Sequence, residues 1–371
     1  MKWLAQISRV LVGVLFILSG LIKANDTLGF SYKLEEYFEI FNMPFLNPYA
    51  VLFSMLICIF EIISGFALLL GIYNKLNAWL LLVLIVFFTI LTGYSAITHK
   101  VTDCGCFGDA LKLTPFTSFM KDVVLLILIL FIIFGLKHIQ PLFNKVILNI
   151  TLSAAFLVAT FFTLYTYMFL PVKDFLPYKI GNDIEALTLT PADAPKDEIE
   201  MLFIYEKGGQ RYEFTADKLP EDIDQYEFVD RQDKLIKEGF KPPIHDFKLY
   251  DANGIEFTDS LFAGDGYKLI LVQTKTEASR KGIEEQLAQL SKGWIESGKP
   301  LWALTSSNLV DAQKYAQNHS FLFNYYNMDA IPLKSMLRSN PGVMLLNKNV
   351  VVKKWGAYNI PSFATVQKYM R

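Results

Sequence analysis

The sequence predicts an integral membrane protein in two parts, a bundle of apolar helices followed by a soluble α/β domain. The whole chain is 53% hydrophobic and has a formal net charge of −1. Its apolar residues are unevenly distributed, because residues 1–172 hold nearly all of the long apolar runs. Residues 173–371 have the mixed charge and polar turns of a soluble domain. The chain has no basic cluster, so we exclude nucleic-acid binding.

Five stretches of the first half are long enough to span a bilayer. The hydrocarbon core is about 30 Å thick, so a spanning helix needs about 20 largely apolar residues. The five predicted spans are 3–22, 50–72, 78–98, 119–136 and 146–170. The first is predicted to remain as a helix rather than to be removed as a signal peptide, because no small-residue cleavage site with a polar start follows it.

The basic residues of the short loops favour a cytoplasmic N-terminus. One side has Lys2, Arg9, Lys75, Lys137 and Lys145, and the other has Lys23, Lys33, Lys100, Lys112 and Lys121. The first group lies in shorter segments without acidic neighbours, which is typical of the cytoplasmic side. Five crossings then put the soluble domain on the periplasmic side of a bacterial inner membrane, with the loop that joins the third and fourth spans.

Glu61 is a carboxylate well inside the second predicted span. An ionised group at that depth costs a few kcal/mol, so its side chain must face protein or water. Two interpretations stay open: a proton or ligand site, such as a small-molecule transporter would need, and a helix-packing contact to Ser19, Thr92 or Tyr94. Cys58 is interpreted as a small buried apolar residue.

The sharpest local signal is Thr-Asp-Cys-Gly-Cys-Phe-Gly-Asp at residues 102–109. Cys104 and Cys106 can close a small ring only with a strained backbone, for which Gly105 supplies the dihedral freedom. Strain makes such a disulfide a relatively strong oxidant. On the outer face of a membrane, where disulfides persist, this suits thiol–disulfide exchange.

Three other interpretations of this loop stay open. A metal site needs about four ligands, and the nearby donors are Cys104, Cys106, His99, Asp103 and Asp109. The two cysteines could also form a purely structural bridge that shapes the loop, or remain free thiols.

Parts of the first half resemble the DoxX family. Residues 9–23, Arg-Val-Leu-Val-Gly-Val-Leu-Phe-Ile-Leu-Ser-Gly-Leu-Ile-Lys, resemble its first helix, and Glu-Ile-Ile-Ser-Gly at 61–65 resembles its second. Asp-Cys-Gly-Cys-Phe-Gly at 103–108 narrows the resemblance to the MauE-like branch, over roughly residues 1–138.

This resemblance implies a four-helix membrane module implicated in disulfide formation or maturation of periplasmic proteins. Cys104 and Cys106 would then be the working pair. The fifth span, within residues 139–172, and the soluble domain depart from the short family pattern.

The second half is predicted to contain a connecting segment, 173–241, and an α/β domain, 242–371. In the segment, 201–205 and 210–214 alternate around Gly208-Gly209, which predicts a hairpin. The domain is predicted to have strands at 245–249, 267–272, 301–305, 321–325, 342–346 and 350–355, and helices at 277–295, 308–319 and 332–337. Strands that alternate with helices before a closing hairpin indicate an α/β sandwich.

This order of elements resembles the thioredoxin fold over roughly residues 242–368. The resemblance puts Pro341 at the position of that fold's cis-proline. It puts Thr276 and Ser279 where the fold has its two active-site cysteines, so the domain cannot perform thioredoxin chemistry alone. We interpret it as a docking module that presents a groove near these three residues to an extended partner segment.

Two function hypotheses follow. In the first, the chain is a membrane thiol–disulfide factor whose soluble domain positions a periplasmic or envelope protein partner. In the second, it is a non-enzymatic membrane anchor or assembly subunit of an envelope complex. We assign no cofactor, since no quinone-binding pattern is readable in the sequence.

Overall fold

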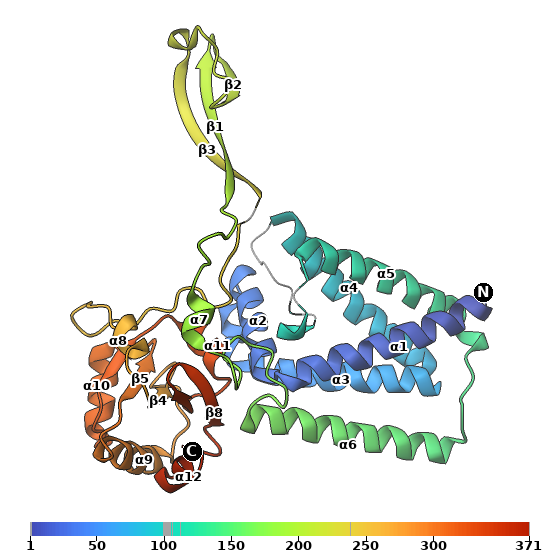
Figure 1. Cartoon of the computed structure of the whole chain (residues 1–371). Helices are drawn as coiled ribbons and strands as arrows, with labels where there is room; N and C mark the ends of the chain where they lie inside the picture. The colour runs from blue at the N-terminus through green and yellow to red at the C-terminus, as the bar shows by residue number, and fades with distance from the viewer. Residues whose placement is uncertain (1, 99–104, 106, 112, 238, 371) are drawn as a thin grey trace. The chain divides into compact units, whose positions relative to one another are not determined.

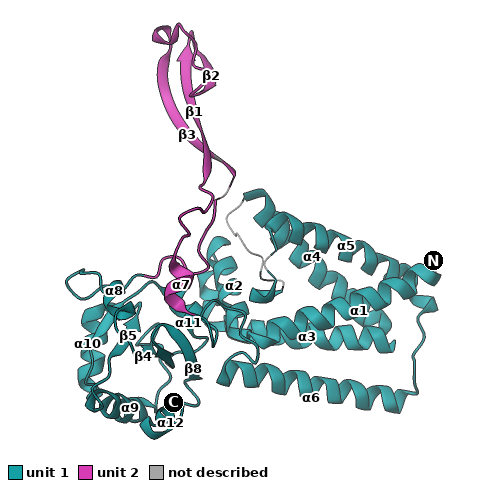
Figure 2. Ribbon diagram, viewed as in Figure 1, with its two compact units in different colours: residues 1–182, 248–371 teal, residues 183–247 magenta. Residues whose placement is uncertain are grey.

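The computed structural model describes residues 2–370 except 99–104, 106, 112 and 238. They form two compact units, one of residues 1–182 with 248–371 and one of residues 183–247 (Figure 2). The first unit contains the membrane helices and an α/β domain, and the second contains a small sheet.

Five helices of the described residues are long and apolar enough to cross a membrane, as predicted (Figure 1). They are α1 (Lys2–Asn25), α3 (Ala50–Leu70), α4 (Asn74–Thr98), α5 (Pro115–Phe134) and α6 (Lys145–Phe169). The 3₁₀ helix η1 (Pro44–Tyr49) leads directly into α3, and η3 (Leu136–His138) follows α5. A bilayer requires every backbone polar group to be satisfied internally, which helices achieve.

A sixth helix of this region, α2 (Thr27–Ile40), was not predicted. Asp26 caps its first turn by accepting a hydrogen bond from the Gly29 amide at 2.8 Å. Its buried residues include Thr27, Phe30, Leu34 and Tyr37, which follow the helical repeat along one face. Helix α2 has too few residues to span a bilayer and carries Lys33 and three glutamates, so its sequence lacks the pattern of a membrane span.

Helices α1 and α3 approach each other closely through glycine. A Cβ atom on Gly65 of α3 would lie 2.6 Å from the carbonyl oxygen of Gly13 in α1. Such contacts are typical of helix packing in membranes, where small residues let two backbones meet.

The α/β domain has a five-stranded sheet in the order β6-β5-β4-β7-β8. Its strands are β4 (Tyr267–Val272), β5 (Leu301–Thr305), β6 (Tyr325–Asn327), β7 (Gly342–Asn347) and β8 (Val350–Gly356). Strands β4, β5 and β6 are parallel, whereas β7 and β8 are antiparallel to their neighbours. The helices are α8 (Thr258–Phe262), α9 (Glu284–Glu296), α10 (Leu309–Asn318), α11 (Ala330–Met336) and α12 (Phe363–Gln367). The predicted α/β class is confirmed.

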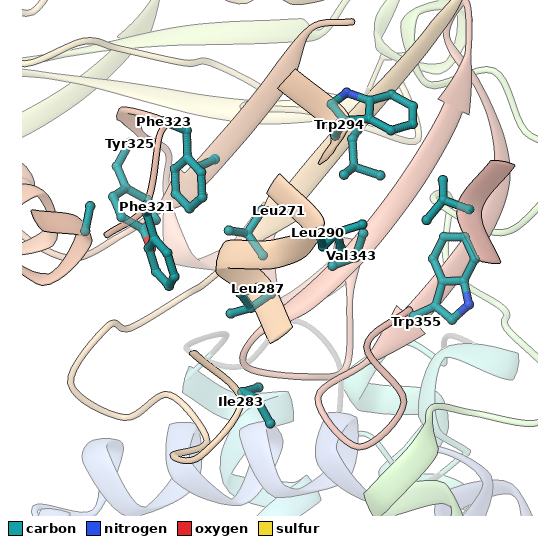
Figure 3. Close-up of a cluster of buried hydrophobic side chains, with 14 of the residues drawn as sticks. Leu271, Ile283, Leu287, Leu290, Trp294, Phe321, Phe323, Tyr325, Val343 and Trp355 are labelled. Atoms are coloured by element: carbon teal, nitrogen blue, oxygen red, sulfur yellow. The ribbon is translucent and has the colours of Figure 1, made fainter. Parts of the chain in front are cut away.

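A large apolar core stabilises this domain (Figure 3). Leu271 of β4 and Val343 of β7 meet Leu287 and Trp294 of α9 there. Strand β4 is buried over five consecutive residues because it lies in the middle of the sheet with both faces covered.

Three predicted elements of this domain differ from the structure: one strand is absent among the described residues, and one helix and one strand have other bounds. Residues 245–249 form no strand, and the neighbouring Tyr250 makes only isolated bridges, to Glu256 and Asn327. The long helix begins at Glu284 rather than at 277, since Gly282 adopts a φ of +83° that a helix does not allow. Strand β6 follows Phe321 and Phe323, whose apolar side chains join the core without pairing in the sheet.

The second unit holds α7 (Ile184–Thr188), β1 (Glu198–Lys207), β2 (Gln210–Thr215), η4 (Ile223–Gln225) and β3 (Glu227–Lys237). Strands β1 and β2 form the predicted hairpin, and β3 pairs with the other edge of β1. Tyr205 packs against Phe214 and Phe228, with ring centroids 6.0 and 5.6 Å apart. Strand β3 was missed because charged residues interrupt its apolar alternation.

We expect Gly65→Leu to disrupt the bundle, because the new side chain would meet backbone of α1. Overpacking of this kind costs about 1–3 kcal/mol or more. The melting temperature of the detergent-solubilised protein should fall. The matched control is Val83→Leu on α4, where 67% of the side chain is exposed and an added methylene meets no packed backbone. Equal melting temperatures for the two variants would contradict the close packing.

Candidate functional site

The predicted cysteine pair lies outside the described residues, together with His99 and Asp103. The described part of the loop includes Gly105, Phe107 and the short 3₁₀ helix η2 (Gly108–Ala110). Gly105 and Gly108 have φ values of +67° and +51°, and the Gly108 amide donates to the Gly105 carbonyl at 3.0 Å. Both glycines therefore adopt the left-handed backbone conformation that glycine tolerates best.

Asp109, the last residue of the motif, forms an ion pair that the sequence did not predict. Its Oδ2 accepts a hydrogen bond from Nη2 of Arg338 at 2.7 Å. Nε of Arg338 donates to Oδ2 of Asp26 at 2.8 Å, and its Nη1 donates to the carbonyl of Lys334. Arg338 thus joins the α/β domain to two acidic residues of the membrane module.

The guanidinium of Arg338 is only 8% exposed. Burial lowers the pKa of Arg338, and the carboxylates of Asp26 and Asp109 more than reverse this effect, so the pKa lies above its ordinary value. The charge is stabilised by bonds from three of its nitrogens. A second pair nearby joins Lys334 to Glu35 of α2 at 3.2 Å.

Thr276, Ser279 and Pro341 come together at one end of the sheet. Thr276 and Ser279 are buried in the loop between β4 and α9, and the Asn340–Pro341 peptide bond is cis. The amide of Arg280 donates to the carbonyl of Asn340 at 3.0 Å, which joins the two loops.

The polar side chains at this edge carry hydroxyl and carboxylate groups. The amide of Thr276 donates to Oγ of Ser307 at 3.0 Å, and the same hydroxyl donates to Oε2 of Glu277 at 3.0 Å. The backbone amide of Glu277 and the Ser307 hydroxyl hold the pKa of the Glu277 carboxyl below its ordinary value. The arrangement can bind polar groups, but it has no atom that forms a disulfide.

Glu61 is paired inside the bundle with Lys23 rather than with Ser19, Thr92 or Tyr94. Its Oε1 lies 2.5 Å from Nζ of Lys23 in α1, and both side chains are buried. Thr92 donates instead to Asp122 of α5 at 2.9 Å. Asp122 was missed because it stands near the start of its predicted span, where an acidic residue usually reaches the interface.

Asp122 also forms an ion pair with Lys121, whose Nζ lies 2.7 Å from its Oδ1. The Lys23–Glu61 and Lys121–Asp122 pairs line one cavity between α1, α3, α4 and α5. Its lining includes Lys23, Glu61, Lys121 and Asp122, and it also includes Phe107 from the cysteine loop. The loop and the buried charges are therefore neighbours in the membrane module.

Comparison with known proteins identifies this module. Residues 1–135 match the family model of methylamine utilisation protein MauE. The membrane module is MauE-like. This confirms the predicted resemblance, and with five apolar helices it characterises the chain as a bacterial membrane protein. Residues 199–238 match a domain of unknown function, DUF8463, which covers most of the sheet β2-β1-β3.

The chain is also similar to Protein TlpB of Flavobacterium psychrophilum. The two are 26% identical over 206 residues, which cover 53% of this chain and 52% of that protein. The chain therefore spans about half the length of the curated relative that it matches.

We expect Arg338→Met to destabilise the first unit strongly. The substitution leaves Asp26 and Asp109 without their cation, and loss of one partner of a buried pair costs about 3–5 kcal/mol. Thermal unfolding of the purified protein measures this loss. The triple variant R338M/D26N/D109N should recover part of it, because no unpaired charge remains.

The matched control for this prediction is Arg231→Met. Arg231 pairs with Asp233 on an exposed strand of the second unit, where an ion pair contributes little. A loss for Arg338→Met no greater than that of the control would contradict the role given to Arg338.

Proposed function

We propose that the chain is a thiol–disulfide factor of the bacterial envelope, with Cys104 and Cys106 as its working pair. The observation that carries the proposal is the Arg338 ion pair to Asp109. Asp109 stands three residues after Cys106, and three residues of chain span at most about 11 Å. Arg338 stands three residues before Pro341. The link therefore supports a cysteine loop that works beside the cis-proline edge of the thioredoxin-like domain.

In the proposed exchange, the electrons pass from two thiols of the partner to the Cys104–Cys106 disulfide, so no further oxidant is needed. A thiolate of the partner attacks one sulfur of the Cys104–Cys106 disulfide, and the other cysteine leaves as a thiolate. The second partner thiolate then attacks the mixed disulfide. The partner gains a disulfide, and the pair receives two electrons and, at neutral pH, two protons.

In this proposal the thioredoxin-like domain binds and does not react. An extended segment of the partner would bind at the edge of the domain near Thr276, Ser279 and Pro341. The lack of a thiol at these positions supports the division of labour, since no competing disulfide can form within the domain. The proposed topology puts this domain and the cysteine loop in the periplasm of a bacterial inner membrane.

We expect the single variants Cys104→Ser and Cys106→Ser to trap mixed disulfides with envelope proteins, since one thiol remains without its resolving partner. Electrophoresis without reductant detects the adducts. Cys58→Ser is the control, because Cys58 is fully buried in α3 and has no access to a partner. The double variant C104S/C106S should leave partner thiols reduced; unchanged partner redox state would sink the proposal.

A labelling experiment tests on which side of the membrane the cysteine loop lies. A membrane-impermeant maleimide should label Cys104 and Cys106 in intact spheroplasts only after reduction, because the pair is oxidised in the periplasm. Labelling that requires lysis of the cells would show that the loop is cytoplasmic and would contradict the proposed topology.

A second candidate function is a non-enzymatic anchor or assembly subunit of an envelope complex. The thiol-free thioredoxin-like edge favours it, because such an edge can hold a partner without exchange. Trapping experiments that yield no adduct, together with a stable complex extracted in mild detergent, would select this function over the first.

A further inference from the structure

The cavity in the membrane module has the size and polarity of a water site. Its volume is about 30 Å³, and its lining combines Lys23, Glu61, Lys121 and Asp122 with apolar side chains such as Phe88 and Leu125. One buried water needs about 10–15 Å³ and several polar partners. The cavity therefore has room for about two water molecules between two lysine–carboxylate pairs.

Glu61 presents an unsatisfied oxygen in this setting. The residue is 2% exposed, and its Oε1 is bound by Lys23. Its Oε2 is also buried and has no hydrogen-bond partner among the described residues. An unsatisfied carboxylate oxygen in a low-dielectric interior is costly, and a water molecule or a proton removes that cost.

Two aromatic rings flank Lys23. Its ammonium lies 5.1 Å from the ring centroid of Phe30 and 4.9 Å from that of Phe88. A desolvated cation–π contact is stabilising. The two rings therefore contact the cation in addition to its carboxylate partner.

A second lysine–carboxylate pair with a nearby aromatic ring lies on the other side of the cavity. Asp122 is 1% exposed and is bound by Lys121 at 2.7 Å and by Thr92. Lys121 also lies 5.3 Å from the ring centroid of Phe107. Among the described residues of the cavity lining, the charged groups beside Glu61 are Lys23 of α1 and the Lys121–Asp122 pair of α5. Cys58 is its titratable neighbour on α3, and α2, α4 and α6 add no charged side chain to the described lining.

We propose that this cavity is a proton-binding site, in which Glu61 takes up a proton from cavity water while Lys23 remains an ammonium. The step is Glu–COO⁻ plus H₃O⁺ giving Glu–COOH plus H₂O, so that one positive charge is added to the site. The proton occupies the oxygen that lacks a partner. This activity goes beyond thiol exchange and does not require it.

Infrared difference spectroscopy of the full-length protein in lipid nanodiscs tests the site. In the wild-type protein, lowering the pH should produce the C=O band of a buried carboxylic acid, shifted in D₂O. The band should be lost in Glu61→Gln and kept in Glu39→Gln, a control on the exposed side of α2. A wild-type spectrum with no such band across the pH range of the folded state would overturn the proposal.

The variant K23Q/E61Q separates loss of the proton site from misfolding of the bundle. It removes both charges without leaving either unpaired, so it should fold and still lack the band. A band that persists in K23Q/E61Q would overturn the proposal.

Discussion

The guanidinium of Arg338, buried between Asp26 and Asp109, is the interaction on which the arrangement of the first unit depends. A cation taken out of water needs compensation from every side, and Arg338 has two carboxylates and one backbone carbonyl. These partners come from the α1–α2 corner, the cysteine loop and α11. Their geometry orients the cis-proline edge of the α/β domain relative to the loop, and through it relates the candidate site to the membrane module.

The same constraint organises the interior of the bundle. A bilayer supplies no water, so an ionised group within a span must find its partner inside the protein. Lys23 with Glu61 and Lys121 with Asp122 meet this requirement, and each lysine also faces an aromatic ring. Each carboxylate has a lysine partner, but one oxygen of Glu61 makes no hydrogen bond among the described residues. Full satisfaction would make a rigid contact, whereas this arrangement leaves a place for a proton.

Two loops at one end of the α/β sheet are joined through the backbone. Thr276 and Ser279 lie in the loop before α9, and a cis peptide bond precedes Pro341 in the loop before β7. The amide of Arg280 donates to the carbonyl of Asn340 and joins the two loops. A backbone contact of this kind does not depend on which side chains stand at positions 276 and 279.

The sequence by itself determined the five spans, the β1–β2 hairpin and the α/β class, because these depend on local hydropathy and short-range repeats. It also indicated that Glu61 must face protein or water. The sequence did not predict helix α2 or strand β3, because the apolar periodicity of each is weak and the element is stabilised by the surface against which it packs. Only the tertiary structure decided which charges meet. Lys23 and Glu61 are 38 residues apart, and Asp109 and Arg338 are 229 apart. The partner of a buried charge depends on where the chain returns in space, which no local pattern specifies.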